Sequence, residues 1–292
     1  MGSLYGFTIK SELPLERLNA AAGTRGELRI ELAGGPLRAP SQEPVSTLIG
    51  EGGQCWYASY ELENGGCLVE LPPTVSFLLE PDEGRIVVNS LDADAELLEH
   101  RIASSAICTL LAMRGDLVLH ASAVEVGGRA VLFCGPTLRG KSTLARVLGE
   151  AGCRVLGEDG IAIGLDGDRP TAFPGARGVR VRSRNRNGGG RQRTNLVTDP
   201  GDGEPPPCPV GTVVLLDERG GALEVEPLQP AQALALLTPN LIHSGGRAAI
   251  GAAFSRLATL LRSVPALRVS LPDDLETLPA TARKFLALMT LS

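Results

Sequence analysis

The sequence is poor in lysine and has no long apolar segment. Lysine occurs only at Lys10, Lys141 and Lys284 of the 292 positions, whereas arginine is common. No run of about 18 apolar residues is present, so we expect no membrane span. The N-terminus lacks a basic segment followed by a long apolar one, so we expect no secretory signal. The net charge of −5 gives no reason to expect nucleic acid or an anionic membrane as a partner.

The sequence also lacks cysteine pairs at C-x-x-C spacing. This absence disfavours a zinc site and a dithiol redox centre. Several of the cysteines lie inside apolar segments, as small buried residues do, and we expect reduced thiols in a cytoplasmic protein. The six positions are Cys55, Cys67, Cys108, Cys134, Cys153 and Cys208.

A phosphate-binding loop lies near the middle of the chain. Residues 135–142 have the sequence G-P-T-L-R-G-K-S, which matches the pattern G-x-x-x-x-G-K-[ST]. The apolar segment Arg129–Cys134 predicts a buried strand before the loop. Apolar residues at helical spacing predict a helix after it, ending near Gly152. Such a loop presents backbone N–H groups and the positive end of a helix to an anion. The sequence therefore predicts that the protein binds a nucleotide.

The residues of this loop have distinct expected roles. Lys141 would reach the β- and γ-phosphates, and Ser142 would give its hydroxyl to Mg²⁺. Arg139 lies at an unrestricted position of the pattern, and one interpretation is that its side chain points to solvent. ATP and Mg²⁺ are the expected cofactors. We expect the nucleotide to contact Gly135, Pro136, Thr137, Leu138, Arg139, Gly140, Lys141, Ser142 and Thr143.

Further ionisable residues lie on both sides of the loop. His120 precedes a predicted hairpin whose turn is Gly127-Gly128. Glu158 and Asp159 follow the short apolar run Cys153–Gly157. Phosphoryl transfer to a hydroxyl requires Mg²⁺ near the phosphates and a carboxylate that accepts the hydroxyl proton. Because adjacent residues at a strand end point to opposite sides, we expect the two carboxylates to differ in role. The alternatives are a capping or surface acidic pair and a structural histidine.

The histidine, the loop and the acidic pair together, from His120 to Ile163, resemble the catalytic core of the HPr serine kinases. They are also similar to the kinases of peptide precursors, such as the lasso-peptide kinases, and more distantly to the phosphoenolpyruvate carboxykinases. The resemblance implies ATP-dependent phosphorylation of a serine or threonine hydroxyl on a peptide precursor or small protein. The resemblance leaves the oligomeric state open, and the net charge gives no nucleic acid or membrane as an expected partner.

The resemblance also implies roles for single residues. In these kinases an Asp-Asp pair occupies the acidic position, and its first member is the base. Glu158 would therefore accept the proton, and Asp159 would lie near the metal with Ser142. His120 would contact the phosphates or orient the acidic pair. Lys141 completes this catalytic set. A further glycine-rich signature of the HPr kinases is missing, which argues against HPr itself as the substrate.

The expected fold is α/β, with a P-loop core of the HPr kinase and phosphoenolpyruvate carboxykinase type behind a β-rich N-terminal module. We expect this module at residues 1–91, a connecting helix capped by Asp92 or Asp94 at 92–115, and the catalytic domain at 116–292. A single apolar face is predicted for the helix Arg247–Arg262 from Ile250, Phe254, Leu257 and Leu261. Other helices are expected at Gln229–Leu237 and Asp273–Met289. Strands are expected at Tyr5–Lys10, Glu27–Leu32, Gln54–Glu61, Cys67–Leu71, Val75–Glu80, Arg85–Asn89, Gly211–Leu216 and Leu267–Leu271.

An arginine-rich segment, residues 177–193, contains seven arginines around three consecutive glycines. It precedes an acidic, proline-rich piece, Asp199–Cys208, and we expect both to be loops. Three interpretations of the arginines stay open. In these interpretations the arginines form a lid over the phosphates, a docking strip for an acidic peptide, or a solvated loop.

A second acidic pair, Asp217-Glu218, provides the alternative function. Four apolar residues followed by Asp-Glu are typical of the strand that holds Mg²⁺ and activates water in P-loop ATPases. The chain would then be an ATPase or a nucleotide-binding partner protein without a phosphoryl acceptor. We interpret Asp217-Glu218 instead as a turn at a strand end.

Overall fold

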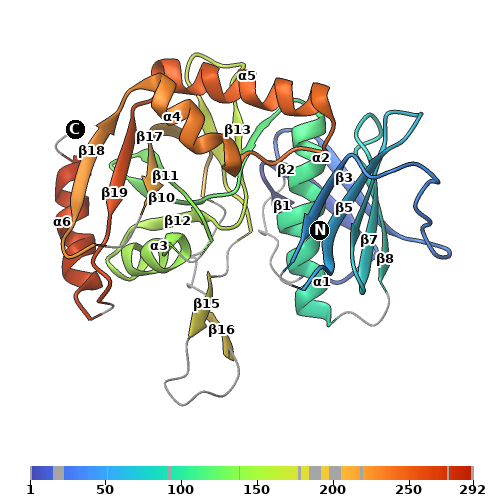
Figure 1. Ribbon diagram of the computed structural model, residues 1–292, viewed down its shortest axis with the longest axis horizontal. Helices are drawn as coiled ribbons and strands as arrows, with labels where there is room; N and C mark the ends of the chain where they lie inside the picture. The colour runs from blue at the N-terminus through green and yellow to red at the C-terminus, as the bar shows by residue number, and fades with distance from the viewer. Residues whose placement is uncertain are drawn as a thin grey trace. The chain divides into compact units, whose positions relative to one another are not determined.

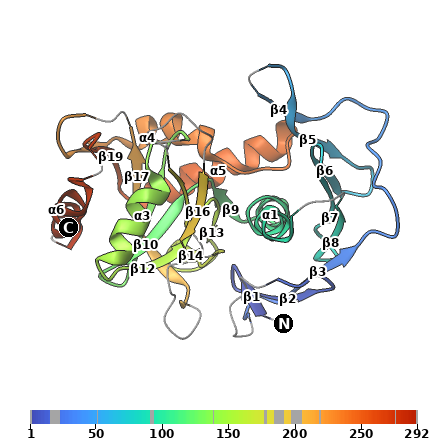
Figure 2. The same cartoon turned by 90° about the horizontal axis from the view of Figure 1, so that it is seen from below.

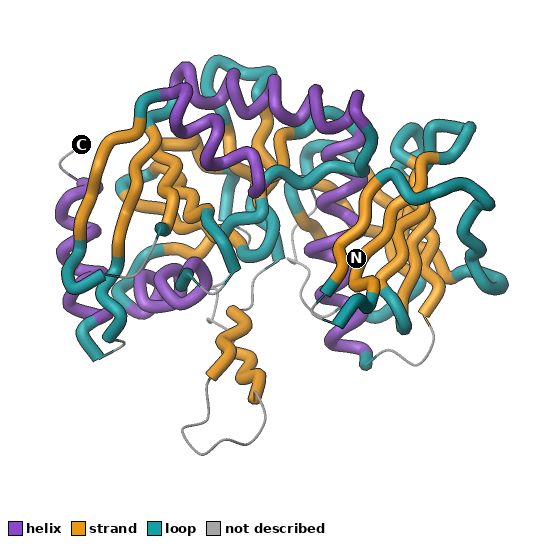
Figure 3. Tube along the Cα trace, viewed as in Figure 1, coloured by secondary structure: helices purple, strands orange, loops and turns teal. Residues whose placement is uncertain are grey.

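The computed structural model describes the chain except for residues 1, 16–22, 51, 91–93, 138, 177–178, 184–191, 197–204, 218–219, 275 and 291–292. It divides into two compact units, the first comprising Met1–Val118 and Leu241–Arg256 and the second Leu119–Asn240 and Leu257–Ser292. Both strands and helices are abundant (Figure 3), so the expected α/β class is confirmed. The three-part division and the kinase type of the core stay predictions. Within the described ranges, no helix has the length and apolar character needed to cross a membrane.

The described residues of the first unit form an eight-stranded sheet with the order β1-β2-β3-β8-β7-β6-β5-β4 (Figure 2). The six strands expected in this region are confirmed. The sequence analysis missed β1, which is only three residues long, and the exposed edge strand β4. The bounds are Gly2–Leu4 (β1), Phe7–Ser11 (β2), Glu27–Leu32 (β3), Ser46–Ile49 (β4), Cys55–Glu61 (β5), Cys67–Leu71 (β6), Val75–Glu80 (β7) and Arg85–Ser90 (β8).

A helix lies against one face of this sheet (Figure 2). The Asp94 side chain caps it by accepting hydrogen bonds from the backbone N–H groups of Glu96 and Leu97 at 2.9 and 3.1 Å. Its middle turn is a π-helix, where the Tyr5 hydroxyl donates to the carbonyl of Ala103 at 3.2 Å. The expected helix is therefore confirmed, apart from its π-helical turn. Its parts are Ala95–Arg101 (α1), Ile102–Ile107 (η1) and Cys108–Met113 (α2).

The second unit is built on a nine-stranded sheet of described residues with the path β12-β10-β11-β17-β14-β13-β9, and β19 joins β17 to β18. The antiparallel hairpin β10–β11 is confirmed, and both turn residues, Gly127 and Gly128, have positive φ as this turn requires. The bounds are Leu117–Leu119 (β9), Ser122–Val126 (β10), Arg129–Cys134 (β11), Arg154–Gly157 (β12), Ile161–Gly164 (β13), Thr171–Phe173 (β14), Cys208–Leu216 (β17), Glu224–Leu228 (β18) and Ala266–Ser270 (β19).

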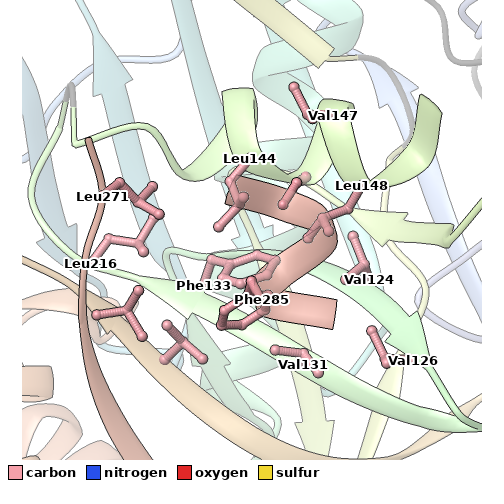
Figure 4. Packing of buried hydrophobic residues seen from close by; sticks show 14 of the residues in the cluster. Val124, Val126, Val131, Phe133, Leu144, Val147, Leu148, Leu216, Leu271 and Phe285 are labelled. Carbon is pink, nitrogen blue, oxygen red and sulfur yellow. The ribbon is translucent and has the colours of Figure 1, made fainter. Parts of the chain in front are cut away.

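Two helices, α3 (Lys141–Glu150) and α6 (Leu278–Thr290), contribute to the core of the second unit. Figure 4 shows the buried side chains of α3 facing those of the sheet, with Phe133 of β11 beside Phe285 of α6. The centroids of these two rings are 5.8 Å apart. Because β11 is packed in this way, the loop that follows it starts from a fixed strand end.

The arginine-rich segment is not wholly a loop, contrary to our expectation. Val179–Ser183 (β15) pairs antiparallel with Gln192–Leu196 (β16), as Figure 1 shows. Valines at alternate positions, Val179 and Val181, favour a strand, and β-branched residues are common in strands. The remaining arginine positions of the segment, 177, 184, 186 and 191, lie outside the described residues.

The predicted start of the last helix needs correction. The last helix begins at Leu278 and not at Asp273, because the Asp274 carboxylate accepts the backbone N–H of Glu276 at 2.9 Å and forms a local turn. The other expected helices are confirmed as α4 (Pro230–Leu237) and α5 (Arg247–Ser263).

On α5 the expected apolar face is buried only in part. Leu257 and Leu261 are buried, but Ile250 and Phe254 are 43% and 41% exposed. Helical periodicity predicts which face is apolar, but it does not determine how much of that face other elements cover.

Candidate functional site

The first residue of the phosphate loop is fixed by a close approach of two strands. The strand β11 runs parallel to β17, and Gly135 directly follows β11 with φ of 133°. A Cβ atom at this position would lie 2.4 Å from the carbonyl oxygen of Leu216. Only glycine therefore fits where the chain leaves β11 and enters the loop.

The loop ends at the start of α3. Gly140 precedes the helix with φ of 98°, and a glycine has no side chain that could cap the first helical N–H groups. These N–H groups and the helix dipole form the expected environment for a phosphate. Ser142 and Thr143 are half-buried in the first turn. The structure thus confirms the strand, loop and helix predicted around the motif, while Leu138 lies outside the described residues.

Lys141 lies at the first position of α3 and is only 7% exposed. Its Nζ donates to the carbonyl oxygens of Gly135 and Pro136, at 2.8 and 3.2 Å. Burial lowers the pKa of Lys141, and the nearby Cys134 and Asp159 oppose this shift. The lysine is therefore held inside its own loop, where its ammonium group is poorly solvated.

His120 lies between β9 and β10 and contacts the acidic turn. Its Nδ1 is 3.0 Å from the carbonyl oxygen of Asp159. Because a carbonyl only accepts hydrogen bonds, this contact places the proton on Nδ1 and leaves Nε2 as an acceptor in the neutral ring. Burial and then the charge of Lys141 lower the pKa of His120, against the opposing charge of Asp159. The neutral imidazole is thus the favoured form at pH 7.

The two carboxylates of the acidic pair have different surroundings. Glu158 is 5% exposed, whereas Asp159 is half-buried. Asp159 has φ of 59°, a left-handed conformation that aspartate tolerates better than most residues. This backbone conformation forms the turn whose carbonyl His120 contacts. The roles assigned to Glu158 and Asp159 stay predictions.

The structure brings together three residues that are distant in the sequence. The charge of Asp159 acts on both Lys141 and His120, and the charge of Lys141 acts on His120. A cation, a neutral imidazole and a carboxylate therefore lie within electrostatic range of one another near the start of α3. This arrangement can bind phosphate and hold a metal ion through an oxygen ligand.

The sequence analysis missed Asn240, which is also part of this site. It is the last residue of the 3₁₀ turn Thr238–Asn240 (η2) after α4 and is 6% exposed. Its side-chain amide donates to the carbonyl of Gly135 at 3.2 Å. Neither hydrophobic periodicity nor a motif marks Asn240, because its role depends on contacts with residues over 100 positions away.

Asp217, the residue of the alternative interpretation, follows β17 and is half-exposed. Its carboxylate is 3.2 Å from Nε of Arg268 on β19. Both residues line a surface hollow of about 330 Å³ together with Glu224, Glu226 and Ser270. Asp217 therefore already has a cationic partner, and Glu218 lies outside the described residues.

Comparison with known proteins gives little further information about this site. No family model matches the sequence, and no curated protein is significantly similar to it. Among solved structures, the Hpr(Ser) kinase/phosphatase from Coxiella burnetii is similar over 60% of this chain and 90% of that one. The sequence identity is 12% and the TM-score is 0.34. A likeness this distant carries no argument about function, which we therefore base on the residues of the site.

Proposed function

We propose that this protein transfers the γ-phosphoryl group of ATP to a serine or threonine hydroxyl of a peptide precursor or small protein. The observation that supports this proposal best is the grouping of Lys141, His120 and Asp159 near the first turn of α3. The Nδ1 atom of His120 is 3.0 Å from the Asp159 carbonyl oxygen, and the charges of Lys141 and Asp159 act on one another and on His120. A phosphate loop alone would suit any nucleotide-binding protein. Phosphoryl transfer also requires Mg²⁺ and a carboxylate that accepts the hydroxyl proton. Asp159 offers an oxygen ligand for the metal, and Glu158 next to it offers the second carboxylate.

In this proposal the loop binds the phosphates with its backbone N–H groups, and Lys141 moves from the carbonyls of Gly135 and Pro136 to the β- and γ-phosphates. A poorly solvated ammonium group gains more from a phosphate partner than a hydrated one does. Burial of Lys141 thus prepares it for this exchange.

The residues present fit Mg²⁺. Ser142 offers a hydroxyl and Asp159 a carboxylate, and Mg²⁺ prefers oxygen ligands. Among the described residues, no group of three or more His, Cys, Asp or Glu side chains could hold a metal ion. Mg²⁺ usually binds through one or two carboxylates together with substrate phosphates and water, so it needs no such group. When bound, it would neutralise charge on the phosphate oxygens.

The acceptor step then uses the acidic pair. The substrate hydroxyl oxygen forms a bond to the γ-phosphorus, the bond from that phosphorus to the bridging oxygen breaks, and ADP leaves. Glu158 accepts the hydroxyl proton, as the first residue of the pair. The Nδ1–H group of His120 holds the Asp159 carbonyl and so orients the turn that carries both carboxylates.

The experiment is incubation of the full chain with MgATP and candidate peptides, with mass spectrometry to detect a phosphorylated serine or threonine. Lys141→Met should abolish the product, whereas Lys284→Met, an exposed lysine on α6, should not. Binding of ATP without transfer to any hydroxyl substrate would overturn the proposal.

One observation favours an ATPase as the second candidate. Asp217 follows the strand that lies parallel to and beside β11, which is a position from which a carboxylate can reach a nucleotide-bound metal in P-loop proteins. Release of phosphate from ATP without peptide, lost in Asp217→Asn but kept in Asp159→Asn, would establish that function.

A further inference from the structure

We propose that Asn240 is a positioning residue that holds the Gly135 carbonyl while Lys141 moves to the phosphates. This inference rests on the proposed nucleotide-binding function. It assigns a role to a residue outside both the phosphate loop and the acidic pair.

The contacts of Asn240 join two parts of the site. Its Nδ2 donates to the carbonyl oxygens of Gly135 and His120, at 3.2 and 3.4 Å. Its own backbone carbonyl accepts the N–H of His120 at 2.7 Å. Because both neighbours of the amide group are carbonyls, the amide nitrogen and not its oxygen must face them. Asn240 thus fixes the backbone of His120 and the first carbonyl of the loop with one buried side chain.

The Gly135 carbonyl has a second donor, the Nζ atom of Lys141 at 2.8 Å. A carbonyl oxygen has two lone pairs, so Lys141 and Asn240 together satisfy it. When Lys141 leaves for the phosphates, this buried carbonyl would lose its charged donor. A buried acceptor without any donor is strongly disfavoured. The hydrogen bond from Asn240 remains, so the Gly135 carbonyl still has a donor after Lys141 has left.

This reasoning predicts a coupling between the two residues. In Asn240→Leu the carbonyl keeps only Lys141, and the lysine can bind ATP only by leaving the carbonyl without a donor. We expect the dissociation constant for MgATP to rise about 10-fold or more. In a Lys141→Met background no lysine has to leave, so the same change at Asn240 should alter that constant less than about twofold.

The experiment is a double-mutant cycle with a fluorescent ATP analogue, titrated against the wild type, each single variant and the double variant. Asn89→Leu is the matched control, because Asn89 also donates through Nδ2, to Ser76 at 3.4 Å, but belongs to the sheet of the first unit. It should leave nucleotide affinity unchanged. If Asn240→Leu does not fold, Asn240→Ser replaces it, since a serine side chain is too short to span both carbonyls.

The outcomes separate this inference from the proposed function. Equal weakening of nucleotide binding in both backgrounds would show that Asn240 only supports the fold, and no weakening in either would show that it is dispensable. Both results overturn the inference while leaving the kinase proposal intact. Failure of the wild type to bind the nucleotide would overturn the proposed function itself.

Discussion

Replacement of Lys141 by methionine should make the nucleotide-free protein more stable while removing its function. Lys141 is 7% exposed, and burial lowers its pKa, so the folded state disfavours the charged ammonium group. Methionine has a similar length and carries no charge. The change therefore removes an unfavourable burial with little change in packing.

Each carbonyl that loses Lys141 in the Lys141→Met variant still has a hydrogen-bond donor within reach. The carbonyl of Gly135 keeps the amide of Asn240 at 3.2 Å, and Pro136 is exposed, so its carbonyl is accessible to water. We expect a net increase of about 1 kcal/mol in the free energy of unfolding, the usual size of a single stabilising substitution. For a chain of 292 residues this raises the melting temperature by about 2 °C.

Urea unfolding without nucleotide measures this gain, and the same experiment with MgATP tests the function. A ligand at 100 times its dissociation constant stabilises the folded state by about 2.7 kcal/mol. The wild type should therefore become the more stable protein when MgATP is added. Lys284→Met is the control and should change stability by less than about 0.5 kcal/mol. A nucleotide-free Lys141→Met protein that is clearly less stable than the wild type would refute this reasoning, because Lys141 would then be a structural cap.

Three other predictions follow from the site. Glu158→Gln and Asp159→Asn should each abolish phosphoryl transfer while Asp217→Asn retains it, as measured by phosphopeptide formation; the reverse pattern would indicate an ATPase. Because the pKa of His120 is lowered on folding, the folded protein binds fewer protons than the unfolded chain, so stability should fall as pH drops below about 6.5. His120→Asn should reduce that loss in urea unfolding between pH 5 and about 7.5, and an unchanged pH dependence would contradict the shift. Deleting Asn185 to Gln192 should lower turnover or peptide affinity with little change in melting temperature, and unaltered kinetics would exclude a lid or docking role.

Several elements of each unit were predictable because their signals are local. A two-residue hairpin turn requires positive φ at both central positions, and glycine adopts positive φ readily. Gly127-Gly128 therefore specifies the β10–β11 turn without help from distant residues. The loop motif between an apolar strand and an amphipathic helix likewise needs no distant residue. Asp94 caps its helix through N–H groups only two and three residues away.

Two other predictions were wrong, one about the secondary structure of the arginine-rich segment and one about the burial of α5. The arginine-rich segment contains β15, whose strand signal consists of two valines that alternate with charged residues. This strand pairs with β16, and the residues between the two strands lie outside the described ranges. On α5, the same apolar spacing that buries Leu257 leaves Phe254 41% exposed. Periodicity describes one element, whereas burial depends on what packs against it.

The sequence by itself determined that this protein has a phosphate-loop motif between a strand and a helix, with Lys141 and Ser142 at its end and an acidic pair beyond the next strand. Chain connectivity and backbone preference are enough for that, because each signal lies within a few residues. The tertiary structure decided which of these groups meet. It places Asp159 where its charge acts on both Lys141 and His120, and it brings Asn240 to the carbonyl of Gly135. Such contacts depend on the pairing of distant strands and on close packing, which no local pattern in the sequence encodes.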